Sequence, residues 1–513
     1  MSDLQHLAAE LAASGIETVF GIPGSGASLT LCDALASRGV AFTTTHSEAS
    51  AAIMAGIQSR VSGRTGAAIS IKGPGLANMI PGLAACRFEA LPLVAICEAY
   101  PPDVPASKAH KRMDHEILAA PTVKGRRFLS ADGPGFDTMS AWAEREAPGP
   151  VLLDIAATAI ASDAPPDRPV PPAEKDPLPA IRRAEKPVVI AGTLAVRQAW
   201  SAALNRLAVP VFSTAGAKGV VDETLPQAAG VYTGVGLDKV PEREILDAAD
   251  LVVGLGLRSS EVLAAGLQDL PAVNVDPLGA ALSSGFDYQA TAGVDVFADV
   301  VDALATKNWG LDMLARSRRR LQQALSGAFL PAACYAQIEH RFAGNARIVI
   351  DTGYFCTIAE HAVTATRPDR FLGSGLSRYM GIALPMAVGA ALHDPALPTI
   401  LAIGDGGIGM FAAELRLAVA HRSPLLVVLM SDGGFGSVRT RAIQDGLIQS
   451  PMLQVGGSWL QVMSAMGLTA LAAADETGFA DALAQWEPEA GPAYIEATFD
   501  PERYQDMVQG IRA

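Results

Sequence analysis

Two aspartates beside glycines are the residues of this sequence best placed for chemistry. Asp405 lies in a Gly-Asp-Gly tripeptide after an apolar segment, 399–403, and Asp432 follows a second apolar segment, 425–430. Both segments are typical of buried strands, and a helical stretch over 411–421 would join them in one strand–helix–strand crossover. The two carboxylates would then meet at the carboxyl edge of one sheet, where they suit a hard divalent cation shared with a phosphate group. Taken alone, a Gly-Asp-Gly tripeptide is also common as a simple strand-to-helix turn.

Glu48 is a further candidate for chemistry. It follows a predicted strand over 41–45 and begins a run of small and apolar residues, 49–57, that favours a helix. One interpretation is a structural carboxylate, exposed at the helix N-terminus and stabilised by the helix dipole. The other is a catalytic carboxyl group at the end of a strand, which gains support only from the motifs around it.

Two glycine-rich segments in the same region each join a predicted strand to a predicted helix. The first, 21–26 (GIPGSG), has neither the Rossmann nor the Walker spacing, so we expect a tight turn at a pocket edge with Ser25 facing a ligand. The second, 71–78 (IKGPGLAN), places Gly73 and Gly75 around a proline. Glycine at such turns lets the backbone approach a ligand closely.

The sequence consists of three segments in which short strands alternate with helices. A proline-rich stretch, 162–186, has the composition of an extended linker. A second break is expected over 306–326, where the basic run 316–320 leads into a helix with a solvated face. Such alternation predicts an α/β protein with three doubly wound parallel-sheet domains, covered by helices on both faces. The predicted domains span residues 1–165, 187–305 and 327–513.

The composition limits the class of protein. Half of the 513 residues are hydrophobic, which allows large cores, and the formal net charge of −14 argues against a nucleic-acid-binding surface. The five cysteines lie in apolar surroundings without metal-ligand spacing and are expected to be reduced. The polar N-terminus is unlike a signal peptide, and no apolar run is long enough to span a membrane. We therefore predict a cytoplasmic protein with a small-molecule substrate and no membrane or nucleic-acid partner.

The order of these motifs resembles that of the thiamine-diphosphate (ThDP) enzymes of the acetolactate synthase and benzoylformate decarboxylase group. The turn at 21–24, Glu48, the turn at 73–78, Asp405 and Asp432 follow one another in that family's order and spacing. Further stretches that resemble the family lie at residues 149–155, 186–192, 214–219 and 380–385. The resemblance therefore covers nearly the whole chain.

The resemblance implies a cofactor bound between two domains. The first domain would bind the aminopyrimidine of ThDP, and the third would bind its diphosphate through a divalent metal, Mg²⁺. In this family the two domains that meet belong to different subunits, which implies a homodimer or homotetramer with the site between subunits. The central domain binds FAD or a nucleotide in some members, but this sequence offers no clear fingerprint for it, so FAD is not expected.

The resemblance also implies roles for individual residues. Glu48 would face N1′ of the pyrimidine, where a carboxyl group held away from water can keep its proton and favour the imino tautomer that accepts the C2 proton. Met380 would support the bent cofactor, with an ordinary core methionine as the alternative. The side chains of Asp405 and Asp432 and the carbonyl of Gly434 would bind the metal. The implied cofactor-binding residues are Gly24, Ser25, Glu48, Asn78, Gly353, Met380, Gly404, Asp405, Gly406, Gly407, Asp432, Gly434, Phe435 and Gly436.

Several positions depart from the family pattern. Asp432 stands where asparagine is usual, and its charge should strengthen cation binding but repel the diphosphate. Tyr-Phe-Cys at 354–356 replaces polar side chains and Gly407 replaces a common serine, so diphosphate binding would rely on backbone N–H groups. Arg378 stands where small residues are usual. It could balance Asp432, bind a substrate carboxylate or form an outward-facing salt bridge.

The loop 108–115 matches by position the family loop that carries polar active-site groups. Its candidates for moving protons or holding an anionic group are His110, Lys111 and His115, with a polar surface loop as the alternative. The adjacent histidine pair of pyruvate decarboxylases is absent, and Ile71 stands where benzoylformate-type relatives carry a histidine. A simple copy of either specificity is therefore not expected.

We predict an enzyme that uses ThDP and Mg²⁺ to cleave or form a carbon–carbon bond next to the carbonyl of a 2-oxo acid. The Gly73–Gly75 turn and Met380 favour an acetolactate-synthase-like carboligase, while simple decarboxylation to an aldehyde shares the first steps. The alternatives from other classes are a non-catalytic cofactor-binding or regulatory homologue and a flavin-dependent oxidoreductase. The predicted catalytic residues are Glu48, His110, Lys111, His115 and Arg378.

Overall fold

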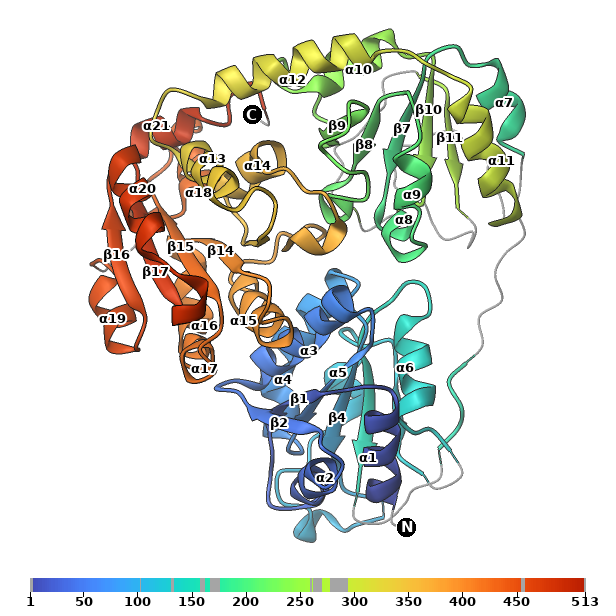
Figure 1. Ribbon diagram of the computed structural model, residues 1–513. Helices are drawn as coiled ribbons and strands as arrows, with labels where there is room; N and C mark the ends of the chain where they lie inside the picture. The colour runs from blue at the N-terminus through green and yellow to red at the C-terminus, as the bar shows by residue number, and fades with distance from the viewer. Residues whose placement is uncertain are drawn as a thin grey trace. The chain divides into compact units, whose positions relative to one another are not determined.

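The computed structural model of the protein describes residues 3–101, 103–130, 133–156, 162–166, 176–258, 261, 270–276, 294–453 and 457–511. Within these residues, three separate β-sheets are built from parallel strands with helices around them (Figure 1). This confirms the predicted α/β fold class with three parallel-sheet domains.

The N-terminal sheet has six strands in the order β2-β1-β3-β4-β6-β5. Its strands are β1 (Thr18–Ile22), β2 (Ala41–Thr44), β3 (Gly66–Ser70), β4 (Leu93–Glu98), β5 (Arg126–Phe128) and β6 (Val151–Ile155). Its helices are α1 (Asp3–Ala13), α2 (Ala27–Ala36), α3 (Glu48–Ser62), α4 (Pro74–Phe88), η1 (Ala106–Lys108), α5 (His115–Ala119) and α6 (Phe136–Glu144). The chain changes direction across the sheet between β1 and β3, which is where parallel α/β sheets bind ligands at their carboxyl edge.

The central sheet has five strands in the order β11-β10-β7-β8-β9. Its strands are β7 (Pro187–Ala191), β8 (Val211–Ser213), β9 (Ala228–Val231), β10 (Leu251–Leu255) and β11 (Ala272–Val275). The elements around it are α7 (Leu178–Arg183), α8 (Thr193–Arg197), α9 (Ser201–Leu204), η2 (Ala215–Ala217), α10 (Pro241–Ala248), α11 (Val294–Ala305) and α12 (Leu311–Leu325). Here the change of direction lies between β7 and β10.

The C-terminal sheet has six strands in the order β13-β12-β14-β15-β17-β16. Its strands are β12 (Arg347–Ile350), β13 (Phe371–Gly373), β14 (Thr399–Gly404), β15 (Leu425–Ser431), β16 (Thr469–Ala473) and β17 (Ala493–Thr498). Its helices are α13 (Pro331–Phe342), α14 (Tyr354–Ala362), η3 (Pro368–Arg370), α15 (Ala383–His393), α16 (Asp405–Phe411), η4 (Ala412–Glu414), α17 (Leu415–Ala420), α18 (Gly436–Gln444), η5 (Ser450–Met452), α19 (Leu460–Ala465), α20 (Glu476–Gln485), η6 (Pro488–Ala490) and α21 (Pro501–Asp506).

The apolar runs of the sequence form these strands because helices or neighbouring strands bury them on both faces. In β15 every residue from Leu425 to Met430 is buried, which explains why its sequence shows no polar alternation. In the N-terminal domain, alternate strand residues such as Val19 and Ile69 pack with Leu7 of α1 and Leu31 of α2 in one core. The change of direction in the C-terminal sheet lies between β12 and β14, so the segments after these two strands share one edge.

The structure adds detail at three of the expected places. The helical stretch expected over 411–421 is present as η4 and α17, and a separate helix, α16, begins earlier at Asp405, whose negative charge is favourable in a first helical turn. The expected break over 306–326 is largely the continuous helix α12. The expected linker over 162–186 contains the short helix α7, and residues 167–175 of it lie outside the described residues.

The basic run 316–320 was expected to be a solvated helix face, and this expectation is wrong for one residue. Arg318 is half-buried and donates hydrogen bonds to the carbonyl oxygens of Glu223, Leu225 and Ala228. The other arginines of the run are exposed. Arg318 therefore attaches α12 to the central domain through backbone groups that sequence periodicity does not reveal.

By its internal contacts the chain forms two compact units. The first comprises Met1–Arg168, Leu384–Ala396 and Phe411–Ser423, and the second comprises Pro169–Ala383, Leu397–Met410 and Pro424–Ala513. In the described part of the chain, no helix combines the length and the apolar character that crossing a bilayer requires. All five cysteines lie among the described residues and are free thiols.

Candidate functional site

Asp405 and Asp432 lie at the adjacent carboxyl ends of β14 and β15, as their sequence positions predicted. The Asp405 carboxylate accepts a hydrogen bond from Ser431 Oγ at 2.8 Å. Its other oxygen accepts the backbone N–H groups of Asp432 and Gly433, both at 3.1 Å. Asp405 therefore fixes the backbone that leads into the second aspartate.

The burial of the two carboxylates and their closeness to each other make the pair suited to binding a cation. Burial raises the pKa of Asp405. The pKa of Asp432 is raised to about 6, by burial first and by the nearby Asp405 carboxylate second. Asp432 Oδ2 is buried and has no hydrogen-bond partner among the described residues. Because a buried carboxylate oxygen without a partner is costly, this set of oxygen atoms fits a hard divalent cation.

The glycines of this site are required by close approach of neighbouring groups. A Cβ at Gly406 would lie 2.9 Å from Met380 Sδ and against the ring of Phe435. Gly404 faces the Phe355 ring, Gly436 faces Asp432 Oδ2, and Gly434 faces a backbone carbonyl in the same way. Neighbouring protein groups already occupy the space that a side chain at these positions would need, which is why the close packing of these turns requires glycine.

Met380 lies against the Gly406 turn, and a buried aspartate holds its loop. The backbone N–H of Gly381 donates to both oxygens of Asp351, at 2.8 and 2.9 Å. A Cβ at Gly407 would collide with Asp351 Oδ2. Glycine rather than serine at 407 is thus a consequence of Asp351, which contacts both the Met380 loop and the turn after β14. Sequence reasoning did not identify Asp351 as a site residue.

Asp351 should make the stability of the cofactor-free protein depend on pH. Its burial raises its pKa to about 7, only partly offset by N–H donors such as Gly381. Because the folded-state pKa lies above the unfolded one, protonation favours folding; this contribution is complete below about pH 4 and is lost as pH rises to about 7. The free energy of unfolding is measured with urea for the wild type and for Asp351→Asn across that range. The wild-type value, relative to that of Asp351→Asn, should fall as pH rises, by roughly 4 kcal/mol at most. Parallel curves for the two proteins would contradict this assignment.

Residues 354–356 lack the polar side chains usual at these positions in the family, as noted from the sequence. Their side chains pack within the domain instead. Phe355 is buried against Gly353 and Gly404, and the ring of Tyr354 lies 6.3 Å from that of Tyr504. Tyr335 donates its hydroxyl to the carbonyl of Phe355 at 3.1 Å. The strand-to-helix turn after β12 is therefore stabilised by aromatic packing.

Arg378 forms an ion pair that none of the sequence interpretations included. Its Nη1 lies 2.5 Å from Oε1 of Glu360, which is buried, and 2.7 Å from Cys356 Sγ. Its φ of 55° is in the left-handed region, which is unfavourable for arginine. The pair points inward rather than to solvent, and it anchors the loop just before Met380. A role for Arg378 toward a substrate stays a prediction.

Glu48 is buried at the first position of α3, rather than exposed as its structural interpretation required. The preceding Ser47 caps the helix by accepting the Ala49 N–H at 3.2 Å. A Cβ at Gly75 would lie 3.5 Å from Glu48 Oε1, so the turn before α4 closes on the carboxyl group. Ile71 lies close to both Gly75 and Gly24. The structure therefore brings the two glycine turns and Glu48 together, whereas Ser25 and Asn78 are exposed beside them.

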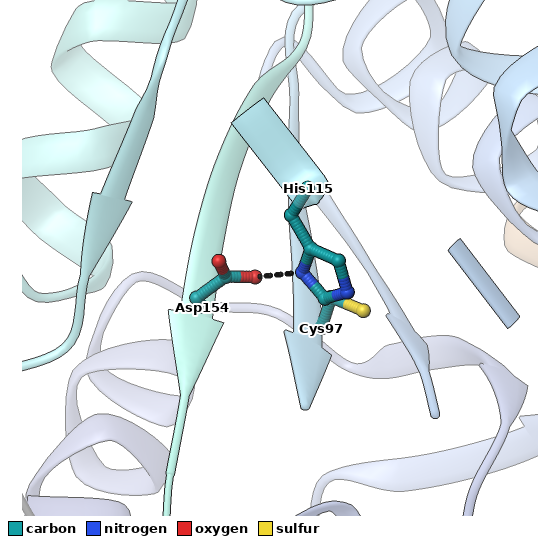
Figure 2. A group of neighbouring side chains, drawn as sticks. All are labelled: Cys97, His115 and Asp154. Carbon is teal, nitrogen blue, oxygen red and sulfur yellow. Dashed lines mark hydrogen bonds and ion pairs between the residues drawn. The ribbon is translucent and has the colours of Figure 1, made fainter. Parts of the chain in front are cut away.

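The loop 108–115 closes over the same turn. His110 and Lys111 are exposed, but the Lys111 carbonyl packs against Gly73. His115 is buried, and its Nε2 accepts the Gly73 N–H at 3.2 Å. Since a backbone N–H can only donate, the proton of a neutral ring lies on Nδ1 and is donated to Asp154 at 2.9 Å (Figure 2).

Cys97, His115 and Asp154 form a buried group whose donor atoms lie within 4.8 Å of one another (Figure 2). Arg126 Nε pairs with the second oxygen of Asp154 at 2.5 Å, and burial raises the pKa of the Cys97 thiol. Both ring nitrogens of His115 are engaged, so the group is a hydrogen-bonded network rather than a metal site. Its effect is to hold the Gly73 turn.

Sequence reasoning also missed a contact at the Glu48 turn. The buried Glu414 carboxylate accepts the backbone N–H of His46 at 3.1 and 3.2 Å and lies 3.2 Å from its Nδ1. His46 is two residues before Glu48, and Glu414 follows α16 in the sequence. No spacing rule connects residues so far apart, and only the fold reveals the pair.

The comparisons with known proteins show which family the chain resembles along its length. Three family descriptions match in order: thiamine pyrophosphate enzyme, N-terminal TPP binding domain, over residues 1–117; the central domain over 176–305; and the C-terminal TPP binding domain over 351–497. Glu48 lies in the first matched region, and Asp405 and Asp432 lie in the third.

Curated relatives match along most of their length. The protein named "Probable 2-ketoarginine decarboxylase AruI" of Pseudomonas aeruginosa is 29% identical over 478 residues, covering 85% of this chain and 83% of the relative. The catabolic acetolactate synthase of Raoultella terrigena is 26% identical over 477 residues, covering 86% and 84%. The large subunit of acetolactate synthase isozyme 2 of Escherichia coli K12 is 26% identical over 472 residues, with the same coverage. With its three matched domains and these relatives, the chain belongs to the thiamine-diphosphate-dependent enzyme family.

Proposed function

We propose that the protein is a ThDP- and Mg²⁺-dependent enzyme that cleaves or forms a carbon–carbon bond next to the carbonyl of a 2-oxo acid. The observation that carries the proposal is the Asp405–Asp432 pair at the glycine-rich ends of two neighbouring strands, with a buried Asp432 oxygen that has no partner among the described residues. We favour an acetolactate-synthase-like carboligase. Simple decarboxylation to an aldehyde is the second candidate, supported by the name of the Pseudomonas relative.

Each residue of the proposed site would have its own role toward the metal and the cofactor. Asp405, Asp432 and the Gly434 carbonyl would hold Mg²⁺, and the backbone at Gly404–Gly407 would bind the diphosphate. Glu48 would hold a proton at the pyrimidine N1′ in a site shielded from water. When bound, ThDP supplies the electron sink for the bond that is broken. Met380, fixed through Gly381 and Asp351, would set the shape of the site above the Gly406 turn.

FAD is not part of the proposal, because a carboxylate of the chain already uses backbone N–H groups that follow β7 and β10 in the central domain. Between the ends of β7 and β10, the Glu261 carboxylate accepts the N–H groups of Thr193 at 2.5 Å and Arg258 at 2.9 Å. Burial raises the pKa of Glu261. A dinucleotide phosphate would have to displace this buried carboxylate from the donors that it needs.

We further propose a homodimer or homotetramer in which the site lies between subunits. The support is family membership together with the placement of Glu48 and Asp405 in different matched domains. Sedimentation should give a mass of at least two chains of 53.1 kDa. A stable monomer that binds and turns over substrate would contradict this arrangement.

The function is tested by cofactor binding followed by a product screen. Calorimetry should show ThDP binding that requires Mg²⁺, and no binding at millimolar ThDP would remove the enzyme proposal. The screen should supply 2-oxo acids with and without an aldehyde or second 2-oxo acid as acceptor. A coupled 2-hydroxyketone product supports the carboligase, and release of an aldehyde alone supports the decarboxylase. Tight cofactor binding with neither product would point to a non-catalytic homologue.

A further inference from the structure

A hollow lined by three cationic side chains lies beside the Gly73 turn, within the N-terminal domain. It has a volume of about 210 Å³ and lies near the carboxyl ends of β3 and β4. Its lining residues are Lys72, Ala99, Tyr100, Arg112, Met113, Asp114, His115, Arg126 and Phe128. Lys72 directly precedes Gly73, and a Cβ at Gly75, two residues further on, would lie 3.5 Å from Glu48 Oε1. The hollow therefore borders the turn that encloses the proposed catalytic carboxyl group.

Three cations and one carboxylate line this hollow, although the whole chain has a formal net charge of −14. His115 adds no charge there, because its Nε2 accepts the Gly73 N–H and its ring is neutral. The one lining carboxylate, Asp114, is occupied as the N-cap of α5 and accepts the Ile117 N–H at 3.0 Å. The lining thus carries more cationic than anionic side chains, an arrangement that favours an anion.

Buried carboxylates behind the lining hold two of the cations in place. Lys72 Nζ lies 2.6 Å from Glu98, which in turn accepts the Ser28 hydroxyl at 2.6 Å. Arg126 Nε lies 2.5 Å from the buried Asp154. Each cation uses only part of its donor set in this way, because an ammonium has three N–H groups and a guanidinium has five. Arg126 Nη1 also lies 3.6 Å from the exposed Glu116 carboxylate, so Nη2 of Arg126 and two N–H groups of Lys72 lie outside these ion pairs.

Two cations also converge on one ring. Lys72 Nζ lies 5.2 Å and Arg112 Cζ 5.5 Å from the centroid of Tyr100. Arg112 donates to the carbonyls of Val104 and Pro101, and no carboxylate pairs with it among the described residues. The two cations repel each other, Glu98 offsets only the charge of Lys72, and an anion beside Arg112 would relieve the remaining repulsion.

We propose that this hollow binds the distal anionic group of the substrate, so that the protein acts on 2-oxo acids that carry a second carboxylate, phosphonate or sulfonate. This inference rests on the proposed function. A cation beside the departing carboxylate would stabilise the substrate more than the transition state in which that charge disperses, so the hollow suits a group that is retained. Its volume is below that of a typical complete ligand site and matches one end of a small molecule. The same lining would repel a cationic side chain such as that of 2-ketoarginine.

The first test uses the cofactor-free protein, so that it does not depend on turnover. Glutarate and inorganic phosphate are titrated by calorimetry into the wild type, Arg112→Leu and a control, Lys108→Leu. Arg112 is exposed and its bonds go to loop carbonyls, so its replacement leaves the fold intact. Lys108 is an exposed lysine of the same loop that does not line the hollow. We expect Arg112→Leu to raise the dissociation constant about tenfold, and Lys108→Leu to change it less than twofold.

The second test measures specificity of the loaded enzyme. The KM for 2-oxoglutarate should rise about tenfold in Arg112→Leu with kcat kept, while the KM for 2-oxobutyrate stays within twofold. Tighter binding of phosphate than of glutarate to the wild type would assign the distal group as phosphonate or sulfonate, and the reverse as carboxylate. The proposal is overturned if neither probe binds at millimolar concentration, or if both leucine variants lose binding equally. Arg112-dependent glutarate binding without any turnover would keep the anion site and reject the proposed function instead.

Discussion

Replacing Glu48 with glutamine is expected to slow proton exchange at C2 of bound ThDP by roughly 10²- to 10⁴-fold. Glutamine has the same shape, so the packing of Gly75 against the side chain and the start of α3 should persist. It cannot take part in the proton transfer that a carboxyl group supports at N1′. Hydrogen–deuterium exchange at C2, read by NMR after acid quench, measures the effect directly, and it does not require a known substrate.

The affinity for ThDP separates this catalytic role from a structural one. In Glu48→Gln the dissociation constant should change less than tenfold, because the diphosphate and the metal supply most of the binding energy. Glu116→Gln, an exposed glutamate of the same domain, serves as the matched control and should behave as wild type. If exchange in Glu48→Gln proceeds at the wild-type rate, Glu48 does not act on the cofactor.

The second large effect is expected for Asp405→Asn, which should weaken Mg²⁺-dependent ThDP binding by about 100-fold or more. The substitution removes a metal-binding charge and also disturbs the acceptor for Ser431 Oγ and for two backbone N–H groups. Asp432→Asn should cost less than tenfold, because the amide keeps one oxygen and relieves the repulsion between two buried carboxylates. Calorimetry with ThDP at fixed Mg²⁺ gives both values.

The contrast between the two aspartates is the informative part of this experiment. Asp405 organises the turn, whereas Asp432 contributes an oxygen that lacks any partner of its own. Asp481→Asn, on the exposed face of α20, provides the control for removing one negative charge from the domain. Equal losses in Asp405→Asn and Asp432→Asn would show that charge alone, and not the hydrogen bonds of Asp405, determines the affinity.

The sequence was sufficient for the parts of the site that depend on local pattern. Glycines and aspartates directly after apolar runs predicted strand ends, and parallel sheets place such ends on one edge. This is why Asp405 and Asp432 could be placed at one sheet edge, and why the three-sheet fold followed from alternating strands and helices, whereas Glu48 and Met380 were singled out by the resemblance to ThDP enzymes.

What the sequence did not predict depends on pairs of residues far apart along the chain. His115 acquires its ring tautomer from Asp154 and Gly73, which belong to other strand ends. Asp351 acquires its role from the loop at Gly381, and Arg378 from Glu360 on α14. A single sequence gives the residue types at these positions but not the tertiary contacts that select among their roles.

The contact between Asp351 and Gly407 has a consequence for engineering this enzyme. A serine introduced at 407, to imitate the pattern of related proteins, would push the Asp351 carboxylate away from the Gly381 N–H and loosen Met380. A smaller residue at 351 would remove that obstruction, but it would also remove the carboxylate that accepts the Gly381 N–H hydrogen bond. The two positions therefore cannot be optimised one at a time, and a mutant library should vary them jointly, together with the loop that begins at Arg378.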